Sequence, residues 1–226
     1  IMKKVVIAGK GLLALKVFNW FIERSNKYEI ICFVPVFDDD LCGKHNEDIE
    51  SLSKKYSIPY IFSGNLEDIP GIANKDFCCD IMQLSFFKTI ITKDIINKFS
   101  IILNIHLSDL PKYRGSRGVN WALKNNEQTQ GVTIHKLDEK LDHGPIISQL
   151  KYTIHPNFQE VIDVYNQAID YAFILFSHTL PDIEHIVPIE QDHSKATYYD
   201  SKDFYKLGDR LTFTKKESLK LDKIYE

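Results

Sequence analysis

The sequence has few cysteines, and none of them form a C-x-x-C pair. The four cysteines are Cys32, Cys42, Cys78 and Cys79. The adjacent Cys78 and Cys79 lie in a run that predicts a buried strand. We therefore expect buried thiols in a reducing cytosol.

Long apolar runs are also absent. No stretch approaches the roughly 18 unbroken apolar residues that a membrane-spanning helix needs. Residues 1–8 are largely apolar but much shorter than the core of a signal peptide with its cleavage site. The sequence therefore predicts a cytoplasmic protein with no membrane partner.

The chain has no strong excess of charge of one sign. It has 28 Lys and Arg against 31 Asp and Glu, a formal net charge of −3. Such a balance gives no general attraction to nucleic acid or to an anionic membrane, so any phosphate recognition must be local. Internal repeats and low-complexity segments are absent as well, and 226 residues suit one principal domain with a modest extension.

Short apolar runs alternate with longer amphipathic segments along most of the chain. The predicted strands are residues 5–8, 29–34, 58–62, 80–84, 101–107, 130–137 and 146–154. Helices are predicted after Gly11, within 38–55 and over 157–180. This order is typical of an α/β, Rossmann-like fold, in which helices flank a mostly parallel sheet. The composition changes at Pro181, which predicts a domain over 2–180 and a short C-terminal extension over 181–226.

Two glycines, Gly9 and Gly11, follow the first predicted strand. Glycines at this point let a backbone approach phosphates at a helix N-terminus, as in dinucleotide-binding proteins. The third glycine of that fingerprint is replaced by Ala14, and no clear acidic residue ends the second strand. A tight turn that leads into a helix explains the two glycines equally well without a ligand.

The predicted strand 101–107 carries two polar residues in an otherwise apolar run. Asn104 and His106 are two positions apart, so their side chains share one face of the strand. Polar groups at the carboxyl end of a buried parallel strand are costly unless they are hydrogen-bonded or face the crevice where open α/β sheets bind ligands. The alternative to a ligand site is a purely structural pair, in which a core histidine is hydrogen-bonded to a core amide.

A loop with three cations follows this strand. It contains Lys112, Arg114 and Arg117 together with two glycines, which suits anionic oxygens such as those of a phosphate. Further along, Asp142 lies in a turn that could present a carboxylate to the same crevice, although it could instead only cap the turn. An Asn, a His and an Asp form a workable set for proton transfer and oxyanion stabilisation.

These motifs, in this order and spacing, resemble those of the N10-formyltetrahydrofolate-dependent formyltransferases over roughly residues 2 to 180. The matching segments are Asn104-x-His106, Leu110-Pro111-x-Tyr113-Arg114-Gly115, Gly131-Val132-Thr133-Ile134-His135 and Asp142-x-Gly144-Pro145-Ile146-Ile147. The resemblance implies the formyltransferase fold and catalytic roles for Asn104, His106 and Asp142. It implies that the folate co-substrate binds at Leu84, Ser85, Phe86, Leu137, Asp138 and Leu141. No metal is implied, and His135 and His143 lack ligand spacing.

Departures from the relatives narrow the expected acceptor. Glycinamide ribonucleotide formyltransferases usually carry a Gly-Ser-Asn loop after the first strand, where this chain has Gly11-Leu12-Leu13. Methionyl-tRNA formyltransferases carry a C-terminal domain larger than the extension over 181–226. We therefore expect no nucleic-acid partner, and methionyl-tRNA or another small amine is only the alternative acceptor. The segment Ala196-Thr197-Tyr198-Tyr199 looks like that of nucleotide-sugar N-formyltransferases, especially those acting on dTDP-4-amino-4,6-dideoxyglucose.

The resemblance therefore implies a dTDP-linked amino sugar as substrate and a homodimer, with a role in making O-antigen or lipopolysaccharide. The expected substrate contacts are Lys112, Tyr113, Arg114, Gly115, Tyr198 and Tyr199. Cations of the 110–118 loop would meet the pyrophosphate, and the two tyrosines would either stack on the pyrimidine or belong to the core.

The expected chemistry is attack of an unprotonated sugar amine on the formyl carbon. The Asn104 amide and a protonated His106 would donate to the formyl oxygen, while Asp142 would hold the imidazole or relay protons. Two readings from other classes remain. A nucleotide-dependent oxidoreductase would use the Gly9-x-Gly11 turn, and a non-catalytic folate or nucleotide binder would keep the pocket without the reaction.

Overall fold

The computed structural model describes residues 2–37, 43–87, 89–208 and 211. The chain divides into two compact units, residues 1–105 and 106–226, which are described separately. None of the described helices is long and apolar enough to cross a membrane.

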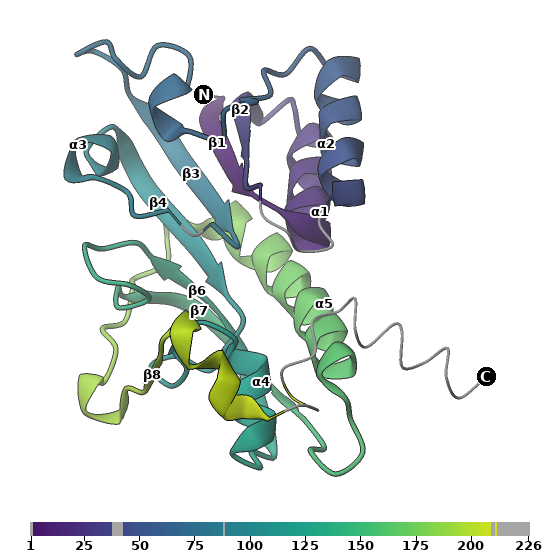
Figure 1. The fold of residues 1–226 in the computed structure, drawn as a ribbon. Coiled ribbons are helices and arrows are strands. Elements are labelled where there is room, and N and C mark those ends of the chain that lie inside the picture. The colour runs from purple at the N-terminus through teal and green to yellow at the C-terminus, as the bar shows by residue number, and fades with distance from the viewer. Residues whose placement is uncertain (1, 38–42, 88, 209–210, 212–226) are drawn as a thin grey trace. The chain divides into compact units, whose positions relative to one another are not determined.

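The first unit is built on four parallel strands in the order β2-β1-β3-β4 (Figure 1). The strands are β1 (Lys3–Gly9), β2 (Tyr28–Pro35), β3 (Cys79–Ser85) and β4 (Phe99–His106). The helices are α1 (Gly11–Ile22), α2 (Gly43–Lys55) and α3 (Lys93–Ile96), with a short 3₁₀ turn, η1 (Leu66–Asp68). Apolar side chains recur on one face of α1 and pack on β1 and β2, and Phe18 meets Phe33 edge to face.

The turn after β1 needs glycine for a steric reason. Gly9 has φ +153°, and a Cβ atom there would lie 2.1 Å from the backbone oxygen of Ser85. The next residue, Lys10, donates its backbone N–H to the same oxygen over 3.1 Å. A close approach between the ends of β1 and β3 thus accounts for Gly9 without a bound nucleotide.

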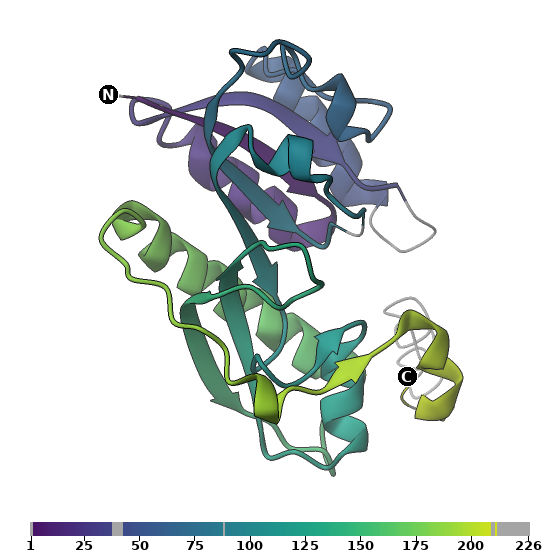
Figure 2. The same cartoon turned by 90° about the vertical axis from the view of Figure 1, so that its left-hand side faces the viewer.

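The second unit is built around an antiparallel pair, β6 (Thr129–Lys136) and β7 (Ile146–Thr153), with Thr133 opposite Gln149. The long helix α5 (Val161–Thr179) runs alongside both strands in Figures 1 and 2. It packs on them through its buried apolar stripe. Its N-terminus is closed by a capping box between Glu160 and Asp163.

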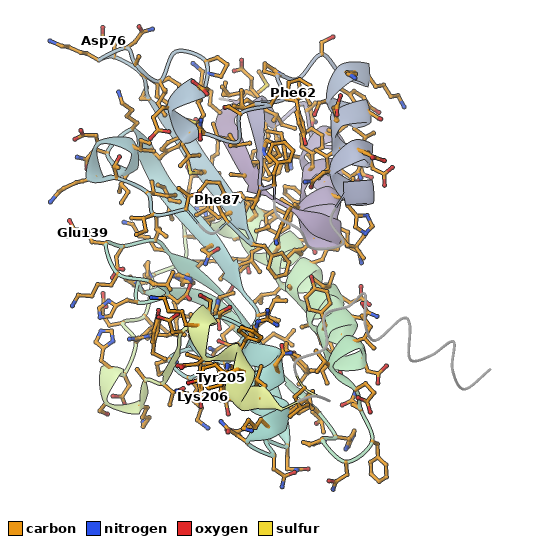
Figure 3. All side chains as sticks on the ribbon, viewed as in Figure 1. Phe62, Asp76, Phe87, Glu139, Tyr205 and Lys206 are labelled. Carbon is orange, nitrogen blue, oxygen red and sulfur yellow. The ribbon has the colours of Figure 1, made fainter. Side chains whose placement is uncertain are left out.

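Smaller elements complete the second unit. Two-residue strands β5 (Arg114–Gly115) and β8 (Tyr198–Tyr199) pair in parallel, and α4 (Gly118–Lys124) follows β5. Three 3₁₀ turns are η2 (Leu180–Asp182), η3 (His193–Lys195) and η4 (Ser201–Leu207). The side chains of Tyr205 and Lys206 extend from η4 in Figure 3, and η4 packs on α4.

The predicted fold class is confirmed, because the chain forms a six-stranded, mostly parallel sheet with helices. Six of the seven predicted strands are present, and the predicted helices lie at 11–22, 43–55 and 161–179. The predicted strand over 58–62 is wrong, because only Tyr60 forms an isolated bridge, to Phe33. Pro59 offers no N–H for a ladder, so the pairing stops at two backbone hydrogen bonds with Phe33.

The prediction for the cysteines is correct in part. Cys32 and Cys79 are buried, and burial raises their thiol pKa, that of Cys32 to about 12 and that of Cys79 to about 11. Cys78 is exposed, because it precedes β3 instead of lying in it. Cys42 and the acidic run 38–40 lie outside the described residues, as do residues 215–223 of the Lys-rich end. The domain boundary near residue 180 stays a prediction.

Candidate active site

His106 ends β4 and is the first residue of the second unit, and both of its ring nitrogens face oxygen atoms within that unit. Nε2 is 2.8 Å from the backbone oxygen of Tyr113, and since a carbonyl can only accept, Nε2 carries a proton. Nδ1 faces the carboxylate of Asp142, 3.6 Å from Oδ1. A protonated ring therefore donates toward Tyr113 and Asp142 together, and the sequence-predicted carboxylate lies within direct reach of the imidazole.

A second imidazole faces the same carboxylate. His135, near the end of β6, is fully buried, and its Nε2 lies 3.5 Å from Asp142 Oδ1. Its Nδ1 is 3.1 Å from the backbone oxygen of Lys136 and donates to it. The two imidazole rings stand nearly perpendicular, with centroids 6.5 Å apart. Asp142 is thus flanked by two histidines, each held by a backbone carbonyl at its far nitrogen.

Asp142 is buried, and its second oxygen is also satisfied. The backbone N–H of Gly115 donates to Oδ2 over 2.9 Å. Burial by itself raises the pKa of this carboxyl, but the charge of His106, the hydrogen bond from His135 and the Gly115 N–H together outweigh burial. The pKa of Asp142 therefore lies well below its ordinary value of 3.8, and the group is a carboxylate at neutral pH.

The backbone at Asp142 is left-handed, with φ 51°. Non-glycine residues adopt this conformation uncommonly, and Asp and Asn tolerate it better than most. The surrounding contacts must therefore hold the turn in place, which is a common property of functional sites.

Asn104 lies two residues before His106 in β4. Both side chains are half-buried. Leu103, which precedes them, and Ile105, which lies between them, are fully buried. This alternation confirms that Asn104 and His106 share one face of the strand. The face they share is the more accessible one.

The residues expected to bind folate lie in two segments, one in each unit. Leu84 and Ser85 end β3, and Phe86 follows with φ 60°. Ser85 Oγ is buried and has no hydrogen-bond partner among the described residues.

The second segment is the loop after β6, which contains Leu137, Asp138 and Leu141. Leu141 exposes 60% of its surface, and Asp138 accepts from His143 Nδ1 over 2.7 Å. Glu139, labelled in Figure 3, extends from the same loop. The loop thus offers an apolar side chain and a partly exposed carboxylate.

The cationic loop has two different kinds of cation. Lys112 is 48% exposed and its ammonium lies 3.4 Å from Glu127. Arg114 is buried and donates to the side chains of Gln191 and His193. The Lys112 ammonium is thus partly exposed, while the described contacts of Arg114 lie within the protein.

Tyr198 and Tyr199 differ in the same way. Tyr198 is 58% exposed. Tyr199 stacks on Trp121 with centroids 4.4 Å apart and on Tyr113 at 5.5 Å, and its hydroxyl accepts from Asn125. Stacking on two rings gives Tyr199 a packing role, whereas Tyr198 is the more exposed ring of the two.

Two residues of the site were missed as site residues from the sequence. His135 was noted only within a motif, although a histidine at a buried strand position signals a paired group. Gln191 donates to the backbone oxygens of Asp142 and Gly144, a contact across 49 and 47 positions that no local pattern reveals. Among the described residues, no group of three or more His, Cys, Asp or Glu side chains could hold a metal.

Comparison with known proteins identifies the family. The formyl transferase family model matches residues 2–179, so the chain belongs to the formyl transferase family. The chain is 31% identical over 204 residues to the methionyl-tRNA formyltransferase of Synechococcus sp. (strain JA-3-3Ab), covering 86% of this chain and 63% of the relative. It spans between 24% and 63% of the length of five curated relatives that it matches.

Solved structures share the fold. The N-formyltransferase from Helicobacter canadensis, in complex with folinic acid and dTDP-3-aminofucose, has a TM-score of 0.71 at 23% identity, over 90% of this chain and 72% of that one. A 4-N formyltransferase from Francisella tularensis has a TM-score of 0.71 at 20% identity, over 91% and 79%.

Proposed function

We propose that this protein is an N-formyltransferase that moves the formyl group of N10-formyltetrahydrofolate to the amine of a nucleotide-linked amino sugar. The observation that carries the proposal is the pairing of the half-buried His106 with the buried Asp142, 3.6 Å apart, at the end of a strand that also presents Asn104. Membership in the formyl transferase family supports the reaction class.

The folate supplies the formyl group, and the protein's residues handle the charge and protons. When the amine attacks, a C–N bond forms, the bond from the formyl carbon to N10 breaks, and negative charge builds on the formyl oxygen in between. The Asn104 side-chain N–H and the His106 Nε2–H are the donors for that oxygen. Nε2 would exchange the Tyr113 carbonyl for the substrate, so its proton is held in place beforehand.

Asp142 provides the opposing charge. Its carboxylate stabilises the imidazolium form of His106 during the reaction, an interaction strengthened by burial. The amine loses one proton and N10 gains one, so the protonation state of His106 is restored after each turnover. The low pKa of Asp142 keeps this carboxylate ionised throughout.

The residues for the co-substrate fit a folate. Ser85 provides an unpartnered buried hydroxyl, and the loop at Leu137, Asp138 and Leu141 provides an apolar side chain and a carboxylate. We propose that Leu84 and Phe86 also contact the folate. The neighbouring enzyme from Helicobacter canadensis was solved with folinic acid, which supports the choice of co-substrate.

For the acceptor we propose a dTDP-linked amino sugar, with dTDP-4-amino-4,6-dideoxyglucose as the first compound to test. Tyr198 is an exposed ring for the thymine, and Lys112 an exposed cation for the pyrophosphate. Fold neighbours described as sugar N-formyltransferases, and one crystallised with dTDP-3-aminofucose, support this acceptor class. A homodimer and a role in O-antigen or lipopolysaccharide synthesis belong to the same proposal.

Methionyl-tRNA is the second candidate acceptor, favoured by the identity of 31% to a methionyl-tRNA formyltransferase. The test is to incubate the protein with N10-formyltetrahydrofolate and, in parallel, with methionyl-tRNA, several dTDP- and UDP-linked amino sugars, and glycinamide ribonucleotide. Mass spectrometry of each acceptor then detects the added formyl group. Formylation of a dTDP-amino sugar alone supports the proposal. Formylation of methionyl-tRNA alone, or of none of them, contradicts it.

A further inference from the structure

We infer that Arg114 and Gln191 are positioning residues that hold Asp142 against His106 and His135. In the contacts described, neither residue touches the imidazole of His106 or of His135. Gln191 binds the backbone of the Asp142 turn, and Arg114 acts through Gln191. The kinetic part of this inference rests on the proposed function, and its structural part does not.

The Gln191 side chain bridges two backbone oxygens of the Asp142 turn. Its side-chain Nε2 donates to the backbone oxygen of Asp142 over 3.0 Å and to that of Gly144 over 2.8 Å. The Gln191 side chain is buried, so both bonds are shielded from water. The turn is also packed tightly, because a Cβ atom at Gly144 would lie 1.8 Å from the Lys136 oxygen.

Arg114 fixes which way the Gln191 amide points. Its Nε and one terminal nitrogen lie 3.2 and 2.7 Å from Gln191 Oε1. A guanidinium can only donate, so the amide oxygen must face Arg114 and the amide nitrogen must face the turn. The same terminal nitrogen lies 2.8 Å from His193 Nδ1, which ties η3 to the arrangement.

The tripeptide that contains β5 therefore holds both members of the catalytic pair. The Tyr113 oxygen accepts from His106, and the Gly115 N–H donates to the Asp142 carboxylate. Arg114, between them, holds the Asp142 backbone through Gln191. A left-handed Asp142 persists only where its surroundings determine it, and these three consecutive residues do so.

This arrangement separates Arg114 from Lys112 in function. The guanidinium is used inside the protein, whereas the Lys112 ammonium is half-exposed. A variant of Arg114 or Gln191 is therefore expected to change the turnover number, and a variant of Lys112 the Michaelis constant for the acceptor.

The kinetic test uses Gln191→Met, which keeps the length of the side chain and removes its donors and acceptor. We expect kcat to fall about tenfold or more, since a small displacement of a reacting group is costly, with both Michaelis constants changed by less than about twofold. Gln128→Met is the matched control, because the Gln128 side chain is exposed and, in the contacts described, donates to the backbone oxygen of the nearby Asn126. An unchanged kcat, or a raised acceptor Michaelis constant with normal kcat, overturns the inference.

A second readout needs no activity. The amide proton of Gly115, bonded to the Asp142 carboxylate, is followed by nuclear magnetic resonance. We expect its chemical shift to move upfield in Gln191→Met and not in Gln128→Met. An unmoved Gly115 signal contradicts the inference. If the unaltered protein transfers no formyl group, the proposed function fails while this readout still decides the positioning role.

Arg114→Lys carries the same test should Gln191→Met prove too unstable to purify. Lysine keeps the charge but cannot donate from two nitrogens to one oxygen. We expect it to move the Gly115 signal in the same direction and to lower kcat. Normal values for both contradict the inference.

Discussion

Replacing Asp142 with Asn removes one negative charge from between two imidazoles and keeps the shape of the side chain. At 3.6 Å and an effective dielectric constant of about 20, a carboxylate and an imidazolium attract by roughly 4–5 kcal/mol. The loss on substitution is smaller than this attraction for two reasons. Asn retains an oxygen for the Gly115 N–H, and solvent screens part of the attraction because His106 is 13% exposed. We expect a loss of about 3 kcal/mol in the transition state, or roughly a hundredfold in kcat.

The same substitution has a signature in stability that requires no substrate. Because the folded pKa of Asp142 is depressed, its ionised form stabilises the protein above the ordinary carboxyl pKa of 3.8, and this stability is lost as the pH falls below that value. At pH 3 the unfolded carboxyl is mostly protonated while the folded one stays ionised. The advantage of the unaltered protein over Asp142→Asn should shrink by about 1 kcal/mol between pH 5 and pH 3.

Urea unfolding of both proteins at pH 5, 4 and 3, followed by circular dichroism, measures this difference. Starting at pH 5 avoids the titration of histidines in the unfolded chain. An advantage that stays constant across this range, or grows toward pH 3, would refute the claim that the neighbours of Asp142 hold it ionised.

Three further predictions concern the remaining site residues. His106→Ala and Asn104→Ala should each lower kcat by roughly a hundredfold with circular dichroism unchanged, because each removes a donor to the formyl oxygen, and near-normal turnover would contradict this role. Tyr198→Ala should raise the acceptor Michaelis constant with stability unchanged, whereas Tyr199→Ala should lower the free energy of unfolding by about 1–3 kcal/mol, since Tyr199 stacks on two rings. The opposite pattern in kinetics and thermal melts would reverse the two assignments. Lys112→Ala should raise the acceptor Michaelis constant more than that of the folate, and equal constants would remove Lys112 from the acceptor site.

The sequence predicts the parts of this molecule that depend on local pattern. The alternation around Asn104 and His106 placed both on one strand face, and the helical period placed α5. The strand over 58–62 failed because an apolar run with Pro59 satisfies composition but lacks ladder donors.

Long-range pairing accounts for most of what the sequence did not predict. Arg114 and Gln191 are 77 positions apart, so a cationic loop looked like a phosphate site although one of its cations binds a buried amide. Tyr198 and Tyr199 are adjacent residues of the same type, and only the ring contacts of Tyr199 with Tyr113 and Trp121 distinguish the stacked ring from the exposed one. Such roles depend on tertiary contacts that carry no local signal.

The most direct measurement of the central claim is single-turnover formyl transfer to a dTDP-amino sugar, with the unaltered protein and with His106→Gln compared side by side by mass spectrometry. We predict that the unaltered protein adds one formyl group to the sugar amine and that His106→Gln does so roughly a hundredfold more slowly. Equal rates for the two proteins, or no formylated sugar with either, would contradict the account.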